Sequence, residues 1–358
     1  MAHRAPGPRR MDRCLIAGRT AQNRPAFLAF FRASARPHPP HHRLHIKVER
    51  VVLVWSVKRL QPGWIAVAPT GATAQAVHVV WPAGERPALR WACSTDWADP
   101  ATGLRQLRRS LPLQQHRCVA LLQRHQYQLL PMDAPDVPRP DWRDAVRWRL
   151  KDMVDFPVED AGIDLLEIPA EHSQRGRAGL LAAVAPRREL EALVQAGDSA
   201  RTPWQALDLP DTALRNLCAL TEEPGRGQAL LSLGAAHSAL VITAHGELLL
   251  SRQIDITLAQ LGEADADTRQ ATWDRAALEL QRTLDNFERQ FNRVGLSRLL
   301  VSPAAPEGFV AYLGELVYLP VQNFALDQAV DLSAVPLLAD PLEQARYLCA
   351  IGAALRTD

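Results

Sequence analysis

The stretch Ala271–Val301, ATWDRAALELQRTLDNFERQFNRVGLSRLLV, carries the strongest fold signal in the chain. Its first part, Ala271–Val294, has apolar residues at helical spacing along one side, and Ser297–Val301 is a short apolar run typical of a buried strand. The apolar side of the helix predicts packing on a sheet, and a groove for a partner is the alternative. A loop without glycine, Ser302–Pro306 (SPAAP), follows the strand.

The same order of predicted strands and turns occurs in both halves of the chain. Three strands with intervening turns are predicted in each half: Trp64–Val67, Ala76–Trp81 and Leu89–Ser94, then Gln228–Leu233, Ser238–Thr243 and Glu247–Gln253. Two such halves facing one another form a cleft, which is a common place for a ligand. Within the first half, Cys118–Leu122 and Tyr127–Leu130 predict a hairpin around His125.

A smaller unit is predicted between the halves. It consists of two helices around two strands joined by a turn: Asp141–Val154, Ile163–Ile168, Gln174–Arg177 (the turn), Gly179–Val184 and Arg187–Ala196. Val146, Leu150 and Met153 mark the apolar face of its first helix, and Trp148 falls off that face. Trp148 is therefore either an exposed anchor for a peptide or buried under the two strands.

The composition is that of a globular protein with an uneven charge distribution. The 358 residues are 47% hydrophobic and 22% charged, with a net charge of +2. Residues 1–50 hold 11 basic and 2 acidic residues, a net charge of +9, whereas the remainder holds 30 basic and 37 acidic residues, a net charge of −7. An acidic body argues against nucleic-acid binding outside the first segment. Five cysteines without CxxC spacing favour reduced thiols, and no apolar run is long enough to span a membrane.

The first fifty residues are rich in Arg, Pro and His and allow three interpretations. They are a basic arm, a disordered tail, or a product of a start codon placed too far upstream, with the true start near Val51–Val57. The predicted organisation begins with a basic extension (1–50), a first-lobe core (58–140) and an inserted subdomain (141–200). The continued first lobe (201–220), a second lobe (228–345) and a C-terminal helix (346–358) follow.

Six segments resemble the PilM-like pilus-assembly ATPases of the actin-like ATPase superfamily, and within them the MshI proteins of the mannose-sensitive hemagglutinin (MSHA) pilus. The segments are AVRWRLKDMVDFPVEDAGIDLLEI, GLLAAVAPRRELEALV, WQALDLPDTALRNL, LLLSRQIDI, ELQRTLDNFERQF and AIGAALR. The resemblance implies an actin-like (ribonuclease H-like) two-lobe duplicated α/β fold with a small inserted α+β subdomain. Members of that family bind ATP through two acid–x–Gly loops and a third loop of paired glycines.

The three loops of this chain depart from that pattern. Ala68 and Ser232 stand where acids are expected, Pro69 removes a backbone donor, and Ser302–Pro306 lacks the glycine pair. The resemblance thus implies a vestigial nucleotide cleft formed by Thr70, Gly71, Ser232, Gly234 and Ser302. It implies no catalytic residue and no bound metal. ATP with Mg²⁺ is disfavoured, although Asp208 or Asp255 could lend a carboxylate.

The resemblance also implies a partner. This is an inner-membrane protein of the PilN or MshJ type, whose cytoplasmic tail would lie in a groove between the first-lobe core and the inserted unit, near Trp148, Arg147 and Phe156. The implied function is a non-catalytic scaffold of type IV pilus assembly in the cytoplasm, peripheral to the inner membrane through its partner. The resemblance is also compatible with a homo-oligomer. The alternative function is that of a nucleotide-binding ATPase of the PilM or FtsA type.

Histidines offer a further test of metal chemistry. His78, His116 and His125 lie on different predicted elements without a ligand pair at i,i+3 or i,i+4 spacing, so surface histidines are expected rather than a metal site.

Overall fold

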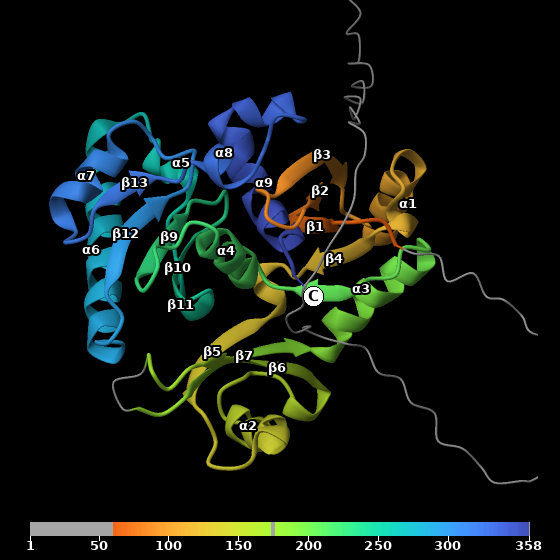
Figure 1. The fold of residues 1–358 in the computed structure, drawn as a ribbon, viewed down its shortest axis with the longest axis horizontal. Helices are drawn as coiled ribbons and strands as arrows, with labels where there is room; N and C mark the ends of the chain where they lie inside the picture. The colour runs from red at the N-terminus through yellow and green to blue at the C-terminus, as the bar shows by residue number, and fades with distance from the viewer. Residues whose placement is uncertain (1–59, 173–175, 358) are drawn as a thin grey trace, which may run out of the picture.

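The computed structural model describes residues 60–172 and 176–357. The first fifty residues, the alternative start near Val51–Val57 and the beginning of the turn predicted at Gln174–Arg177 lie outside the described residues. Figure 1 shows two halves side by side with a smaller sheet below them.

The first half is built on a five-stranded mixed sheet. Its strands are β1 (Trp64–Thr70), β2 (Thr73–Val80), β3 (Ala88–Asp96), β4 (Arg117–Leu121) and β8 (Ala206–Asp208), in the order β3-β2-β1-β4-β8. The strand β1 is antiparallel to β2 and parallel to β4. Strands β1 and β4 read as nearly unbroken apolar runs because they lie in the centre of the sheet with both faces covered.

The second half repeats this topology. Its strands are β9 (Gly227–Ser232), β10 (Ser238–Ala244), β11 (Glu247–Ile254), β12 (Leu296–Val301) and β13 (Val321–Asn323), in the order β11-β10-β9-β12-β13. The central strand β9 is again antiparallel to its hairpin partner β10 and parallel to β12. The predicted duplication of strand, turn, strand, turn, strand is confirmed.

A third sheet of three strands forms the core of the inserted unit. It has the order β5-β7-β6, with β5 at Gln128–Asp133, β6 at Ala161–Ile168 and β7 at Gly179–Pro186. The predicted hairpin of Cys118–Leu122 with Tyr127–Leu130 is wrong, because β5 pairs with β7 and β4 lies between β1 and β8. The small sheet therefore takes its first strand from the residues that precede 141.

Helix α2 (Trp142–Leu150) covers one face of the small sheet. Its buried residues Val146 and Leu150 pack with Ile163, Leu180 and Val184. The opposite face, with Leu166, Ile168 and Leu181, joins the main core, and β6 contacts β11 of the second half. Met153 was predicted on the buried face of α2, but it lies beyond the end of the helix and is exposed.

Two helices are exchanged between the halves. Helix α4 (Pro210–Ala219) follows the first-half strand β8 but packs on β9, β10 and β11 of the second half. Helix α9 (Pro341–Ala354) ends the second half but packs on β1 and β2 of the first. They lie against each other between the sheets (Figure 1), where the Asn216 side chain donates to the Gly352 carbonyl oxygen at 2.9 Å. One hydrophobic core thus spans both halves.

Helix α6 (Ala266–Gln290) flanks the second sheet. It begins five residues before the predicted start, because the Asp265 carboxylate accepts a hydrogen bond from the Thr268 N–H and caps it. Leu280, Leu284 and Phe287 are fully buried. The predicted packing on the sheet is therefore confirmed, and the alternative of a partner groove is not.

The other elements are shorter or lie at the edges. The helices are α1 (Pro100–Ser110), α3 (Arg187–Ser199), α5 (Leu258–Leu261), α7 (Phe309–Leu316) and α8 (Leu326–Ala329). Five single 3₁₀ turns complete the described chain: Leu113–Gln115, Arg124–Gln126, Arg139–Asp141, Val158–Asp160 and Pro336–Ala339. Near α8, the Leu89 N–H donates to the Asp331 carbonyl oxygen and the Asp331 N–H to Pro87, so the edge strand β3 is joined to the second half.

Candidate functional site

The first of the three predicted nucleotide loops is a tight hairpin turn. Thr70 pairs with Thr73, which leaves Gly71 and Ala72 as the two turn residues, and Gly71 has a φ of 60°. Ala68, where the family resemblance implies an acid, lies inside β1 opposite Gln75. Its exposed fraction is 6%, and it belongs to the main core.

The second and third loops are bonded to one another. The Leu233 N–H donates to the Ser302 hydroxyl oxygen at 3.0 Å, and the Ser302 N–H donates to the Leu231 carbonyl oxygen at 2.8 Å. Ser302 is completely buried, so its hydroxyl group joins the two loops of the second half. Gly234 is required by close packing, because a β-carbon there would lie 2.3 Å from the His237 carbonyl oxygen. Ser232 is half-buried at the end of β9.

Nearby carboxylates have partners. Asp208 lies 2.6 Å from the Arg356 guanidinium and also accepts from the Thr212 hydroxyl group. Asp255 accepts from the Gln253 amide at 3.0 Å. Within residues 60–172 and 176–357, no group of three or more His, Cys, Asp or Glu side chains is arranged to hold a metal ion.

A buried polar network that joins the halves was not predicted from the sequence. Asp211 in α4 accepts hydrogen bonds from the Tyr127 hydroxyl group and from the Ser251 hydroxyl group on β11. Burial, and then the negative charge of Asp211, raises the pKa of Tyr127, so the phenol stays protonated as a donor. These partners are 84 and 40 residues apart in the chain, and no spacing rule connects them.

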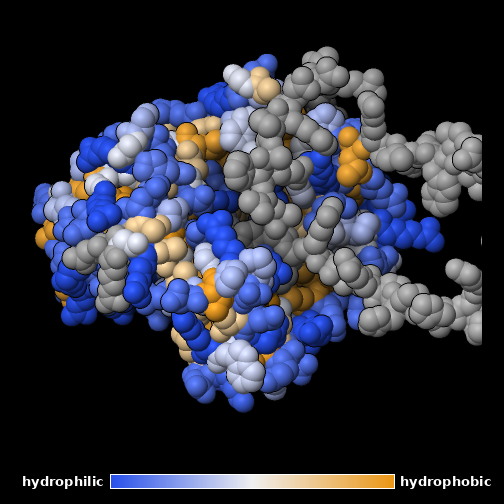
Figure 2. All heavy atoms as spheres, turned by 60° about the horizontal axis from the view of Figure 1, so that its bottom comes forward, coloured by the Kyte–Doolittle hydropathy of each residue, from blue (hydrophilic) through white to orange (hydrophobic). Residues whose placement is uncertain are grey.

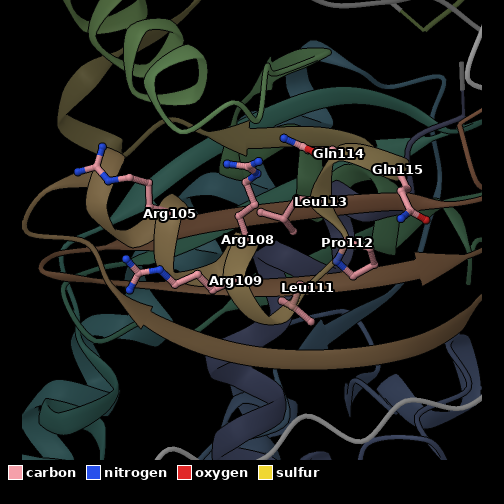
Figure 3. A pocket seen from close by; sticks show the side chains of 8 residues that line it. All are labelled: Arg105, Arg108, Arg109, Leu111, Pro112, Leu113, Gln114 and Gln115. Atoms are coloured by element: carbon pink, nitrogen blue, oxygen red, sulfur yellow. The ribbon is translucent and has the colours of Figure 1, made fainter.

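Two surface cavities lie away from the three loops. One, of about 560 Å³, is lined by residues of α1 and the turn after it (Figure 3). The other, of about 430 Å³, lies between the turn of β2 with β3, the end of α4 and the strands β12 and β13. Neither is lined by Thr70, Gly71, Ser232, Gly234 or Ser302.

The three residues predicted for partner binding have different surroundings. Trp148 on α2 is 76% exposed, which decides between the two interpretations of this side chain in favour of exposure. Arg147 donates to the Val158 carbonyl oxygen, and Phe156 is half-buried against the core under α2. Figure 2, with the lower part of the molecule turned forward, shows hydrophobic residues in small separate patches on a mostly hydrophilic surface.

The histidine prediction is wrong for two of the three residues. His78 and His116 are buried side by side with ring centroids 4.2 Å apart, while His125 is exposed. Burial, then the neighbouring His116, lowers the pKa of His78 to about 4, so this ring is neutral near pH 7. His78 lies on β2 and His116 directly precedes β4, and the start of β1 pairs with both strands at this point.

Among the described residues, Cys118, Cys218 and Cys349 are free thiols. Cys118 and Cys218 are buried, and this burial raises the pKa of both thiols to about 12. They behave as small apolar residues rather than nucleophiles.

Comparison with known proteins gives matches by structure alone. No protein-family model matches the chain, and no curated protein matches its sequence. The chain is similar to the solved structure of a PilM–PilN type IV pilus biogenesis complex, with a TM-score of 0.63 and 22% identity over 82% of this chain and 98% of that chain. It is also similar to a Bacteroides thetaiotaomicron protein with an actin-like ATPase fold (0.44, 10% identity, 78% and 96% covered). A third similar structure is the cytoplasmic domain of EpsL from Vibrio cholerae (0.39, 15% identity, 57% and 75% covered).

The fold prediction is confirmed by the match to the structure of the PilM–PilN complex and by the duplicated sheets. The chain has an actin-like two-lobe α/β fold with a small inserted unit. Among the described residues, no helix is both long and apolar enough to cross a membrane.

Proposed function

We propose that this chain is a non-catalytic cytoplasmic scaffold of type IV pilus assembly, of the MSHA kind, that docks the cytoplasmic tail of an inner-membrane partner of the PilN or MshJ type. The observation that carries the proposal is the overlap with 98% of the chain in the PilM–PilN complex. A scaffold needs a stable frame and an exposed contact, and it needs no reactive group.

The chemistry of the three loops supports a scaffold without turnover. Ala68 offers no carboxylate, and the half-buried Ser232 offers a neutral hydroxyl group. The Ser302 hydroxyl group is engaged with Leu233. Hydrated Mg²⁺ prefers carboxylate oxygens beside the phosphates of its nucleotide, so these residues do not fit Mg·ATP.

The inserted unit offers a firm platform for a tail. Arg143 forms an ion pair with Asp164, Arg149 donates to the Asp133 carbonyl oxygen at 2.9 Å, and Arg147 donates to Val158. These contacts tie α2 to the small sheet and to the 3₁₀ turn before β6, so the exposed indole of Trp148 lies on a helix that is held in place. An extended tail with one apolar anchor suits such a surface, because large aromatic side chains dominate small interfaces.

Co-purification tests the docking proposal. The full chain is expressed with a tagged PilN- or MshJ-type protein, and Trp148→Ala is expected to reduce recovery of the complex strongly. Trp81→Ala is the matched control, because Trp81 is also an exposed indole (42%) but lies directly after β2, on the first-half sheet. If both variants recover the same amount of complex, Trp148 is not part of the interface. If the unchanged chain recovers no complex, the proposed partner is wrong.

Calorimetry tests the alternative of a nucleotide-binding ATPase. Titration of the full chain with Mg·ATP is expected to show no micromolar binding. Micromolar binding would overturn the non-catalytic reading and favour the PilM or FtsA type of activity.

A further inference from the structure

Residues 51–358 carry a net negative charge, but one segment within them has only basic residues among its charged side chains. Between Asp99 and Asp133 the chain contains five arginines and no acidic residue. Three of them, Arg105, Arg108 and Arg109, lie on α1. The last two are in the final turn of the helix, where positive charge is favourable because the carbonyl dipoles point outward there.

These three arginines line the cavity of about 560 Å³ together with the turn after α1. Figure 3 shows them extending from one helix, with the amides of Gln114 and Gln115 on the segment that follows. Eight residues line the cavity: Arg105, Arg108, Arg109, Leu111, Pro112, Leu113, Gln114 and Gln115. Leu111 and Leu113 are buried, so apart from the exposed Pro112 the lining offers the guanidinium and amide groups of the arginines and glutamines.

The guanidinium groups are only partly neutralised within the chain. Arg105 lies 3.6 Å from the Asp99 carboxylate and donates to the Thr102 hydroxyl group at 2.7 Å. Arg108 makes one long bond of 3.5 Å to the Ala200 carbonyl oxygen. Arg109 is exposed and has no hydrogen bond or ion pair within the part of the chain that the structure describes. Positive charge therefore remains available at the cavity.

The start of the described chain lies against the segment that follows α1. The Gln61 N–H donates to the Gln115 carbonyl oxygen at 2.6 Å, and the two side-chain amides are also bonded at 2.6 Å. Gln115 lines the cavity.

We propose that this face of α1 binds the phosphate groups of anionic lipids in a membrane surface. Guanidinium forks match phosphate oxygens in shape and charge, and clustered basic residues are attracted to anionic leaflets. No aromatic side chain is among the eight lining residues, so the stacking platform that single-stranded nucleic acids use is missing. The contact would be direct, in addition to the tether that the proposed function assigns to a partner.

Vesicle binding tests this inference without any pilus protein, so its failure leaves the docking proposal untouched. The full chain is titrated with vesicles of phosphatidylglycerol and phosphatidylcholine in equal parts at low salt. Arg105→Gln/Arg108→Gln/Arg109→Gln is expected to weaken binding at least about tenfold, and Arg109→Gln alone about fivefold. The single variant breaks no contact within the described chain, so its result does not depend on altered folding.

A matched control removes the same charge elsewhere. Arg275→Gln/Arg289→Gln/Arg293→Gln changes three exposed arginines on and after α6 of the second half and is expected to bind the vesicles as the unchanged chain does. Equal loss in both triple variants would overturn the inference, because it would show a dependence on total charge. It would also be overturned if the unchanged chain ignored these vesicles, or bound a short RNA duplex or inorganic pyrophosphate at this face instead.

Discussion

The carbonyl oxygen of Ala213 in α4 would lie 2.2 Å from a β-carbon placed on Gly352 in α9. The two exchanged helices therefore meet backbone to backbone, and Asn216 bonds across the same contact. Glycine at this position sets how closely the halves approach.

Gly352→Ala is expected to destabilise the protein by about 1 to 3 kcal/mol, because two packed backbones must separate to admit a methyl group. Urea unfolding measures the change. Gly314→Ala is the control, since Gly314 lies in α7 with no heavy atom within 4 Å of its added β-carbon, and it should be neutral or stabilise by up to about 1 kcal/mol. Equal effects of the two changes would contradict the packing argument.

The buried ion pair of Arg356 with Asp208 predicts a strong single-variant effect. Arg356→Met should lower the free energy of unfolding by about 3 kcal/mol or more, because it leaves the Asp208 carboxylate buried without its cation. Asp208→Asn/Arg356→Met should recover part of the loss in the same urea experiment. A double variant no more stable than the single one would show that packing of Arg356, rather than its charge, is what matters.

The low pKa of His78 predicts acid sensitivity. With a folded pKa of about 4 against 6.5 in the unfolded chain, the unfolded state takes up a proton first as the pH falls. The stabilisation is complete above pH 6.5 and is lost between pH 6.5 and 4, by about 2 kcal/mol at pH 5.

His78→Gln should flatten this pH dependence in urea unfolding at pH 7.5 and pH 5, while the exposed His125→Gln should leave it unchanged. If His78→Gln leaves the pH dependence of the unfolding free energy unchanged, other groups cause the loss of stability in acid.

Restoring an acid to the first loop is expected to fail. Ala68→Asp buries a carboxylate in the core beside β2, so it should cost more than about 2 kcal/mol and confer no Mg·ATP binding by calorimetry. Thr70→Asp, in the exposed turn, should stay within about 0.5 kcal/mol. Micromolar ATP binding by the Ala68 variant would show that only the acid was missing.

Local periodicity was enough to predict most strands and helices, because the apolar pattern of each element matches the face that it buries. It was not enough for Tyr127–Leu130. The turn Arg124–Gln126 suits a hairpin, and only the distant β7 makes β5 part of the small sheet. Pairing between distant strands is decided by packing that a local window does not contain.

The candidate site was predictable only in outline. The departures at Ala68, Ser232 and Ser302 were visible in the sequence, but the bond of Ser302 with Leu233 joins residues 69 positions apart. Trp148 had two equally good interpretations, because a helix pattern shows which residues share a face but not what covers it. Only the packing of α2 on the small sheet decided between them.

Because α4 and α9 are exchanged, each half supplies the helix that covers the sheet of the other half. If the chain were cut at Thr221–Gly227, each fragment would keep the helix that its neighbour requires and expose the sheet that the lost helix had covered. Two separately expressed fragments should therefore be insoluble alone and reassemble only when made together, like an obligate heterodimer.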